Sequence, residues 1–270
     1  MDRYQAMATF IRVVDTGSFS AATRQLGVGQ NFYERARNAI QEADEAELAA
    51  KGAGAGLSGR LRVSAATTFA RLHIIPELSQ FLADHPQLTV EIILDDRMID
   101  LVAEGVDISL RMGTLADSTA IARKIATGRR SVLATPAYLK RSPALRSPAD
   151  LANHEAIIYS QLPSAWSFLR EGAAVSVSVS GRLKLSAAEG LRAAVLADMG
   201  LTIAPDWMFA PKLESGAVIR VLDAWALPTI DLWAVFPAGR MMTAKARQFA
   251  DFVARIMEVT KPLPLETSTA

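Results

Sequence analysis

The chain contains no cysteine among its 270 residues. This absence excludes disulfide bonds, thiolate catalysis and cysteine metal sites together, and it fits a reducing compartment. The chain also has no large excess of positive or negative charge, because it contains 29 lysines and arginines and 28 aspartates and glutamates. The net charge of +1 creates no whole-chain field toward nucleic acid or membrane, so any such contact has to come from a local patch.

Signals for membranes and secretion are also missing. No apolar run approaches the roughly 20 residues that cross a bilayer. The first residues form a helical pattern flanked by Asp2, Arg3 and Asp15, without the apolar core and small-residue cleavage site of a secretory signal. We therefore expect a cytoplasmic protein that makes no membrane contact.

Motifs of common catalytic and metal sites do not occur in the sequence. The patterns G-x-S-x-G, H-E-x-x-H and G-x-x-x-x-G-K-[ST] are all missing, so hydrolase, zinc-protease and phosphate-loop interpretations lack support. His73, His85 and His154 are widely spaced and have no carboxylates at ligand spacing, which favours surface or turn positions. We expect no catalytic residue, no metal and no cofactor.

The first 30 residues show the front half of a helix-turn-helix. Apolar residues recur at helical spacing over residues 4–14, Gly17 ends that helix, and a short alanine-rich helix at 19–26 follows. In this motif a third helix enters the major groove of DNA. Here the chain runs instead into a long polar helix, residues 31–51, whose thin apolar stripe suits a partner helix.

Residues 52–59, GAGAGLSG, contain a G-x-G-x-x-G pattern. A dinucleotide-binding fingerprint needs a strand before this pattern and a helix after it. Here a helix precedes the glycines and a strand follows them. We therefore interpret the segment as a flexible hinge.

From Leu61 onward, strand and helix patterns alternate. Strands are predicted at 61–65, 88–94, 106–113, 131–136, 155–160, 175–185, 200–205 and 231–237. Helices are predicted from 67 to 81, over 98–105 and 187–199, and from Lys245 to Met257. This alternation predicts an α/β fold with parallel sheets and helices on their faces, divided into two lobes. Because ligands in open α/β sheets bind beyond the carboxyl ends of the strands, the cleft between the lobes is the expected binding site.

Two helix starts face this cleft. Thr67 and Thr68 open the first helix, where free N–H groups and the positive end of the helix dipole suit a carboxylate, although a plain N-cap is equally possible. Ser186 and Ala187 hold the corresponding place in the second lobe. All four are candidate ligand-binding residues.

Two strand ends supply further candidates. Arg111 could pair bidentately with an anionic ligand, or with Asp107 or Asp117 in a purely structural role. Ser160 stands at the end of the strand 155–160, and only this position makes it a candidate. An anion between the lobes is the ligand class these residues favour.

Five separated segments resemble LysR-type transcriptional regulators. They are YQAMATFIRVVDTGSFSAATRQLGVGQ (4–30), LVAEGVDISLRMGTLADSTAIARKI (101–125), RSVLATPAYLKRSP (130–143), SAAEGLRAAVLADMGLTIAPDW (186–207) and AGRMMTAKARQFADFV (238–253). The resemblance implies a winged helix-turn-helix, a long dimerisation helix and a two-lobed domain similar to periplasmic binding proteins. It also implies a small-molecule effector in the cleft, DNA as a partner, and a homodimer or homotetramer.

The resulting domain prediction assigns every part of the chain. It comprises a truncated helix-turn-helix (1–30), a linker helix (31–51), a hinge (52–59), effector lobe I (60–127 and 229–260), effector lobe II (128–228) and a tail (261–270). In the family pattern, a recognition helix and a β wing follow the position of Gln30, a gap here of roughly thirty residues. Sequence-specific reading of DNA has no source without that helix.

The remaining amino-terminal residues offer little to DNA. Residues 1–58 hold six basic and seven acidic side chains, so this segment lacks the basic footprint of non-specific binding. Ser18, Arg24, Gln25 and Gln30 stand where such a module touches DNA, yet a solvated helix surface accounts for them as well.

Three hypotheses follow for the function. The first is a LysR-type regulator that senses a small, anionic effector and whose own DNA binding is impaired. The second is a ligand-binding protein that no longer reads DNA and pairs with intact relatives through residues 31–50, so that mixed oligomers lack complete half-site readers. The third, an enzyme on the same two-lobed fold, has only the cleft in its favour.

Overall fold

The computed structural model describes residues 57–115, 121–238 and 242–259. The predicted helix-turn-helix, linker helix and tail, together with Ser18, Arg24, Gln25 and Gln30, lie outside these residues. Within them, no helix is both long and apolar enough to cross a membrane. The first strand begins at Ser58, inside the segment interpreted as a hinge.

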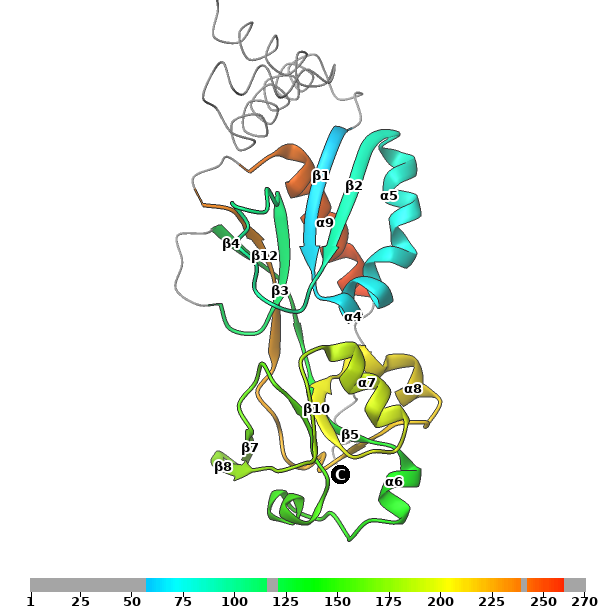
Figure 1. The fold of residues 1–270 in the computed structure, drawn as a ribbon, viewed down its shortest axis with the longest axis vertical. Helices are drawn as coiled ribbons and strands as arrows, with labels where there is room; N and C mark the ends of the chain where they lie inside the picture. Colours follow the sequence, from blue (N-terminus) through cyan, green and yellow to red (C-terminus); the bar gives the residue numbers. More distant parts are fainter. Residues whose placement is uncertain (1–56, 116–120, 239–241, 260–270) are drawn as a thin grey trace, which may run out of the picture.

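Lobe I is built on a five-stranded sheet with the order β2-β1-β3-β12-β4 (Figure 1). Its strands are β1 (Ser58–Ala65), β2 (Gln87–Leu94), β3 (Ile108–Met112), β4 (Ile121–Gly128) and β12 (Ile230–Phe236). β1 pairs in parallel with β2 and β3, whereas β12 pairs antiparallel with β3 and β4. The prediction of a purely parallel sheet is therefore wrong, because the chain returns from lobe II to insert β12 in the opposite direction.

The core of lobe I lies between this sheet and its helices. The predicted apolar face of α9 (Ala244–Val259) is confirmed, since Phe249, Phe252 and Val253 are buried. The Phe81 ring of α5 (Leu78–Asp84) lies 5.5 Å from that of Phe249 and packs edge-on against it. Each fully buried side chain of this kind stabilises the fold by about 1.5–3 kcal/mol relative to exposure.

The predicted helix from Thr67 to Phe81 is present but irregular. It comprises α4 (Thr67–Phe69), a π-helical turn (Ala70–Ile74), a 3₁₀ turn (Ile75–Glu77) and α5. Pro76 accounts for the change of winding, because proline has no N–H to donate to the preceding turn.

The helix predicted over residues 98–105 is wrong. The structure has hydrogen-bonded turns there, with Val106 donating its N–H to the carbonyl of Leu101 at 2.9 Å. The Asp100 carboxylate accepts the N–H groups of Val102 and Ala103 at 2.9 and 3.1 Å. A side chain that binds nearby backbone N–H groups in this way competes with helix formation.

Lobe II contains three small sheets. They are β10-β5-β11, β6-β9 and β7-β8, built from β5 (Arg130–Ala134), β6 (Ile157–Tyr159), β7 (Ala165–Arg170), β8 (Ala173–Ser178), β9 (Leu183–Leu185), β10 (Thr202–Pro205) and β11 (Ile219–Val221). The helices are α6 (Pro136–Lys140), α7 (Ala188–Leu196) and α8 (Ala210–Glu214), with 3₁₀ turns at Pro148–Asn153 and Asp206–Phe209. A single parallel bridge between Ala156 and Leu201 links the β6 region to β10.

The predicted strand 175–185 is two strands rather than one. β8 ends at Ser178, and β9 begins at Leu183 in a different sheet. β8 instead pairs with β7, which the sequence interpretation had missed, through a two-residue turn at Glu171 and Gly172. Both turn residues have positive φ, 51° and 81°, as a tight hairpin of right-handed twist requires.

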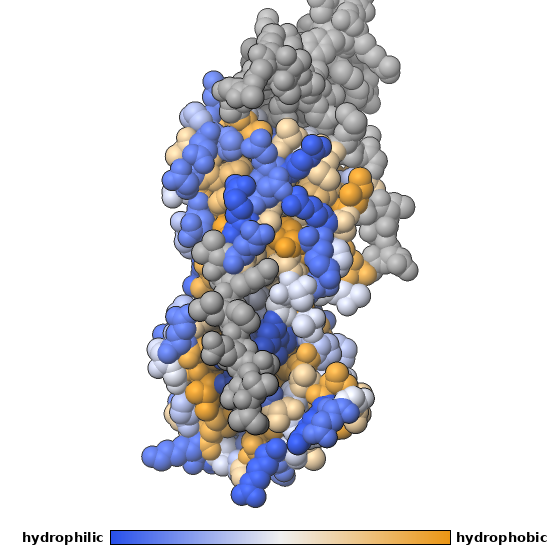
Figure 2. Space-filling view, turned by 180° about the vertical axis from the view of Figure 1, so that it is seen from behind, coloured by the Kyte–Doolittle hydropathy of each residue, from blue (hydrophilic) through white to orange (hydrophobic). Residues whose placement is uncertain are grey.

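The chain crosses between the lobes twice, from β4 to β5 and from β11 to β12 (Figure 1). Hydrophilic and hydrophobic residues are interspersed over the visible back of both lobes, a mixture that is common on protein surfaces (Figure 2). The two lobes have separate apolar cores, with Trp207 packed partly against each. The two-lobed α/β arrangement expected from the sequence is therefore present.

Candidate functional site

The lobes meet at the carboxylate of Asp96, which follows β2. One oxygen accepts the backbone N–H of Thr67 at 2.9 Å, at the start of α4. The other accepts the backbone N–H of Ala188 at 2.6 Å, at the start of α7 in lobe II. A single side chain thus binds the first N–H groups of two helices in different lobes.

Neither helix has a cap of its own. The N-cap residues are Ala66 and Ala187, and neither forms a side-chain capping hydrogen bond. Thr67 is therefore not the N-cap that the sequence allowed, and Asp96 supplies the missing acceptor at both starts. The positive ends of the helices favour negative charge at this point.

Thr67 and Thr68 differ in their surroundings. Thr67 is half-buried and takes part through its backbone, whereas Thr68 is fully buried and its hydroxyl has no hydrogen-bond partner among the described residues. A second contact between the lobes lies one turn further along, where the Arg71 guanidinium donates to both oxygens of Glu189 at 2.9 Å.

Arg111 contacts the segment that contains Asp96. Its guanidinium donates to the carbonyl of Arg97 at 2.9 Å and contacts the hydroxyl of Ser64 at 3.4 Å. Burial lowers the pKa of Arg111, and the negative charge of Asp95 opposes this shift. Of the two structural partners considered, Asp107 accepts the backbone N–H of Arg62, and Asp117 lies outside the described residues.

The lobe II side of the junction contains the other predicted residues. Exposed Ser160 donates its N–H to the carbonyl of Leu185 at 2.8 Å, and the carbonyl of Ser186 accepts from the Gln161 side chain at 3.0 Å. Burial and the charge of Asp96 raise the pKa of the neighbouring Tyr159 to about 12, so this phenol is neutral at physiological pH.

The aromatic side of the junction is formed by Trp207 of lobe II. Its ring lies 5.4 Å from Phe69 and 5.3 Å from His73, both edge-on. His73 is therefore buried, and so is His154, whose Nδ1 lies 3.1 Å from the Tyr138 hydroxyl. The interpretation as a surface or turn residue is therefore wrong for His73, which lies inside a helical turn, whereas His154 is buried but does lie in a bend after a 3₁₀ turn.

A metal site finds no support in the part of the chain that the structure describes. No group of three or more His, Cys, Asp or Glu side chains gathers there at distances suited to a metal ion. The chemistry that the junction offers is recognition of an anion by backbone N–H groups and an arginine.

Known proteins are similar to this chain in sequence and in fold. A family model described as "LysR substrate binding domain" matches residues 54–258. The regulator PtxR of Pseudomonas aeruginosa is 32% identical over 196 residues, which are 72% of this chain and 63% of PtxR. An HTH-type transcriptional regulator of Xanthomonas campestris is 29% identical over 284 aligned positions, covering 90% of this chain and 82% of the relative.

The fold agrees with a solved regulatory domain. That of CrgA, a LysR-type transcriptional regulator from Neisseria meningitidis, matches with a TM-score of 0.67 at 25% identity, covering 73% of this chain and 98% of that domain. The chain therefore belongs to the family of LysR-type transcriptional regulators, and residues 54–258 are its LysR substrate binding domain.

Proposed function

We propose that this protein is a cytoplasmic regulator that senses a small anion at the junction of its lobes. The proposed site comprises Thr67, Thr68, Arg111, Ser160, Ser186 and Ala187, with Asp96 at its centre. The observation that carries the proposal is the convergence of the Thr67 and Ala188 N–H groups on one carboxylate.

The Asp96 carboxylate marks where an effector carboxylate binds. Two N–H groups from two helix starts form an anion site whichever molecule supplies the oxygens. An effector would displace Asp96 and take over its two hydrogen bonds, with Arg111 as a neighbouring cation. Such an exchange would change how the lobes are held together, because Asp96 joins them.

Chemical rescue tests this proposal directly. Replacing Asp96→Ala removes the internal carboxylate, so acetate should bind the vacated N–H groups and raise the melting temperature of the variant. The matched control is Asp95→Ala, because the Asp95 carboxylate binds exposed Arg97 at 2.9 Å instead of a helix start. Acetate should raise the melting temperature of the Asp96→Ala variant more than that of the Asp95→Ala control or of the unchanged protein.

Two results would contradict the proposal. One is equal stabilisation of the Asp96→Ala and Asp95→Ala variants by acetate, which would mean a general salt effect. The other is stabilisation of the Asp96→Ala variant by chloride as strongly as by acetate, because a site formed around the two oxygens of a carboxylate should prefer acetate to a monatomic anion.

DNA binding forms the second part of the proposal. We infer that the chain lacks a recognition helix and wing after Gln30 and therefore binds DNA weakly. The alignment with the Xanthomonas regulator supports a gap in this chain, without placing it after Gln30, because its 284 positions exceed the 270 residues of the chain. The net negative charge of residues 1–58 supports it too.

Restoring the missing segment tests the proposal that the chain binds DNA weakly. A typical family segment is inserted after Gln30, and binding to the upstream intergenic DNA is compared at two salt concentrations. Tight binding by the restored protein alone supports the proposal, and equal binding by both contradicts it. Co-purification with a full-length relative would favour the alternative, in which the chain acts by forming mixed oligomers.

A further inference from the structure

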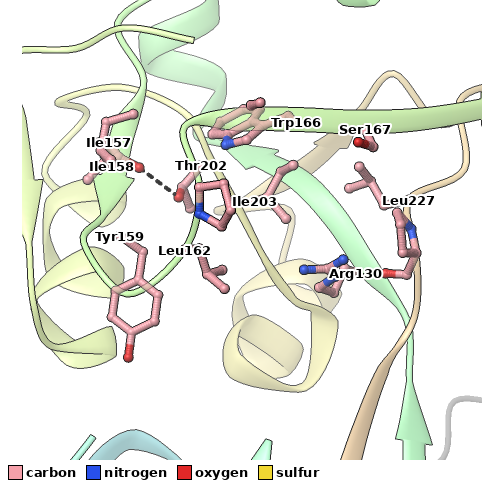
Figure 3. Close-up of a pocket in the computed structure, with 13 residues that line it drawn as sticks. Arg130, Ile157, Ile158, Tyr159, Leu162, Trp166, Ser167, Thr202, Ile203 and Leu227 are labelled. Carbon is pink, nitrogen blue, oxygen red and sulfur yellow. Dashed lines mark hydrogen bonds between the residues drawn. The ribbon is translucent and has the colours of Figure 1, made fainter. Parts of the chain in front are cut away.

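Strand β8 is a free edge of the β7-β8 sheet in lobe II. Its partner β7 is held on both sides, because Leu169 of β7 exchanges two backbone hydrogen bonds of 2.8 Å with Ala226. Trp166 and Ser167 of β7 also line a cavity of lobe II, whereas no residue of β8 does (Figure 3). Among the described residues, no strand or bridge pairs with the outer side of β8. The sheet therefore ends at this strand.

The pairing register shows which backbone groups of β8 point outward. In an antiparallel ladder, successive residues direct their N–H and carbonyl groups alternately toward the partner strand and away from it. Leu169 directs its groups away from β8, so the opposite residue, Ala174, directs its own groups away from β7. Ser176 and Ser178 follow at the same spacing, and all three β8 residues are exposed. Their outward N–H and carbonyl groups have no protein partner in the described part of the chain.

Charge usually protects such an edge from pairing with another molecule. The two outer strands of the lobe I sheet carry charged residues, Glu91 in β2 and Arg123 and Lys124 in β4. β8, with the sequence AAVSVS, contains neither a charged residue nor a proline. Its alternating valines favour a pleated strand, and an edge of this kind can accept one more strand.

The strand is complementary to itself in one antiparallel register. When Ser176 lies opposite Ser176 of a second copy, Ala174 lies opposite Ser178, so every outward N–H meets an outward carbonyl. On the other face of the sheet, exposed Val175 lies opposite Val177 of the copy, and the two valines shield each other from water. No like charges oppose each other along the paired strands.

Charged residues beside the strand favour the same register. Glu171 precedes β8 and Arg182 follows it, and both side chains are exposed. Their present ion pairs, with Arg170 at 3.4 Å and with Glu155 at 3.3 Å, are exposed and therefore weak. Because the two copies run antiparallel, the turn of one copy lies beside the chain that follows β8 in the other. Glu171 of each copy then approaches Arg182 of the other, and these opposite charges attract.

We propose that β8 is an interface between two copies of this chain, which pair their β8 strands antiparallel about Ser176 and join their two-stranded sheets into one continuous sheet. Such a contact is isologous, so the two copies close around a two-fold axis. It uses no residue of the proposed effector site and is separate from the dimerisation predicted through residues 31–50. The proposal therefore does not rest on the proposed function.

Single cysteine variants of the full chain test this pairing, because the chain contains no cysteine of its own. Residues that face each other in a hydrogen-bonded pair have Cα atoms about 5.5 Å apart, which suits a disulfide. On oxidation, Ser176→Cys should form covalent dimers roughly ten-fold faster or more than the matched control Ser167→Cys, as non-reducing electrophoresis measures. Ser167 is also exposed and lies directly opposite Ser176 in the hairpin, but on the strand that the second copy does not reach.

Charge exchange at the same position tests the register. Ser176→Lys and Ser176→Glu each place like charges opposite each other, so each variant alone should show a lower average mass in sedimentation than the unchanged protein. Their equimolar mixture should regain that mass, because opposite charges then meet across the two-fold axis. A mixture as dissociated as the separate variants would overturn the proposal, and so would equal masses in all samples. Oxidation of Ser176→Cys no faster than that of Ser167→Cys would overturn it too, and this is the result expected if the edge accepts a strand of another protein.

Discussion

The Asp96 carboxylate accepts the backbone N–H of Ala188 at 2.6 Å, across 92 residues of chain and from the opposite lobe. Its other oxygen holds the start of α4 in the same way. The junction therefore depends on a side chain that neither helix contains, and its stability can be measured separately from that of each lobe.

Loss of the Asp96 carboxylate should destabilise the protein. We expect Asp96→Ala to lower the free energy of unfolding by about 1–3 kcal/mol, because two backbone N–H groups at helix starts lose their acceptor. Asp96→Asn should cost less, since the amide oxygen can still accept one of these bonds. Urea denaturation measures both, and an Asp96→Ala variant as stable as the unchanged protein would contradict the expectation.

The Arg71–Glu189 ion pair should contribute far less. Its side chains are 44% and 37% exposed, and pairs at that exposure typically contribute about 0.2–1 kcal/mol. Because Glu189 also lies 3.5 Å from Arg192, a double-mutant cycle of Arg71→Ala and Glu189→Ala is needed to isolate the coupling. That coupling should shrink as salt is added, and a coupling that grows with salt would exclude an electrostatic origin.

Two glycines of lobe II should not tolerate a side chain. A Cβ at Gly181 would lie 1.7 Å from the carbonyl oxygen of Ala156, and one at Gly200 would lie 2.4 Å from that of Glu155. Alanine at either position must displace backbone, so we expect losses of about 2–4 kcal/mol in unfolding free energy.

The control for these substitutions is Gly190→Ala in α7. A Cβ there meets only the Leu185 side chain at the ordinary distance of 3.5 Å, so this change should be neutral or stabilise by up to about 1 kcal/mol. Thermal unfolding of the three variants provides the comparison. Equal melting temperatures would disprove the steric argument.

Lowering the pH should reduce the free energy of unfolding, because two histidines are protonated more readily in the unfolded chain than in the folded one. Burial lowers the pKa of both His73 and His154 below 6.5, although Asp150 opposes the shift at His154 and a hydrogen bond with the Trp207 backbone opposes it at His73. The unfolded chain then binds protons that the folded chain does not. Stability should therefore fall as the pH drops below about 6.5, by at most about 1.4 kcal/mol per pH unit for each histidine.

The His73→Gln and His154→Gln variants test this assignment. Each should flatten the pH dependence of unfolding free energy between about pH 7 and 5, measured by urea titration at several pH values. If the slope survives both substitutions together, its source lies in other groups.

Regular patterns predicted the core elements correctly, and local polar chemistry explains the failures. The strand β1 and the apolar face of α9 were predicted from regularly spaced apolar residues, and these residues are buried in the core. The false helix at 98–105 had apolar residues at helical spacing, but Met98 and Val102 are 76% and 39% exposed, so that face is not part of the core. The hydrogen bonds from the N–H groups of Val102 and Ala103 to the Asp100 carboxylate stabilise turns there instead of a helix.

Strands with exposed faces were harder to predict. β4 shows mostly exposed or half-buried residues along its length and lies at the edge of its sheet, so it lacks the apolar alternation of a core strand. β7 could have been found from the turn residues Glu171 and Gly172 between two alternating runs.

The binding of an effector by the candidate residues stays a prediction, and the structure shows only how some of them are arranged. Thr67 and the start of α7 were expected beside the cleft, and the structure brings their N–H groups together. Asp96 was missed, although two successive acids directly after the strand 88–94 were a visible signal. Its role depends on the approach of residues 92 positions apart, which no local pattern contains.

The double crossing between the lobes also sets the order in which the protein can be completed during synthesis. β12 lies between β3 and β4, yet it follows all of lobe II in the chain. At about 5–20 residues per second, β3 waits on the order of ten seconds for its neighbour to be translated. Lobe II is continuous in sequence and can fold first, so lobe I is the first lobe to be started and the last to be completed.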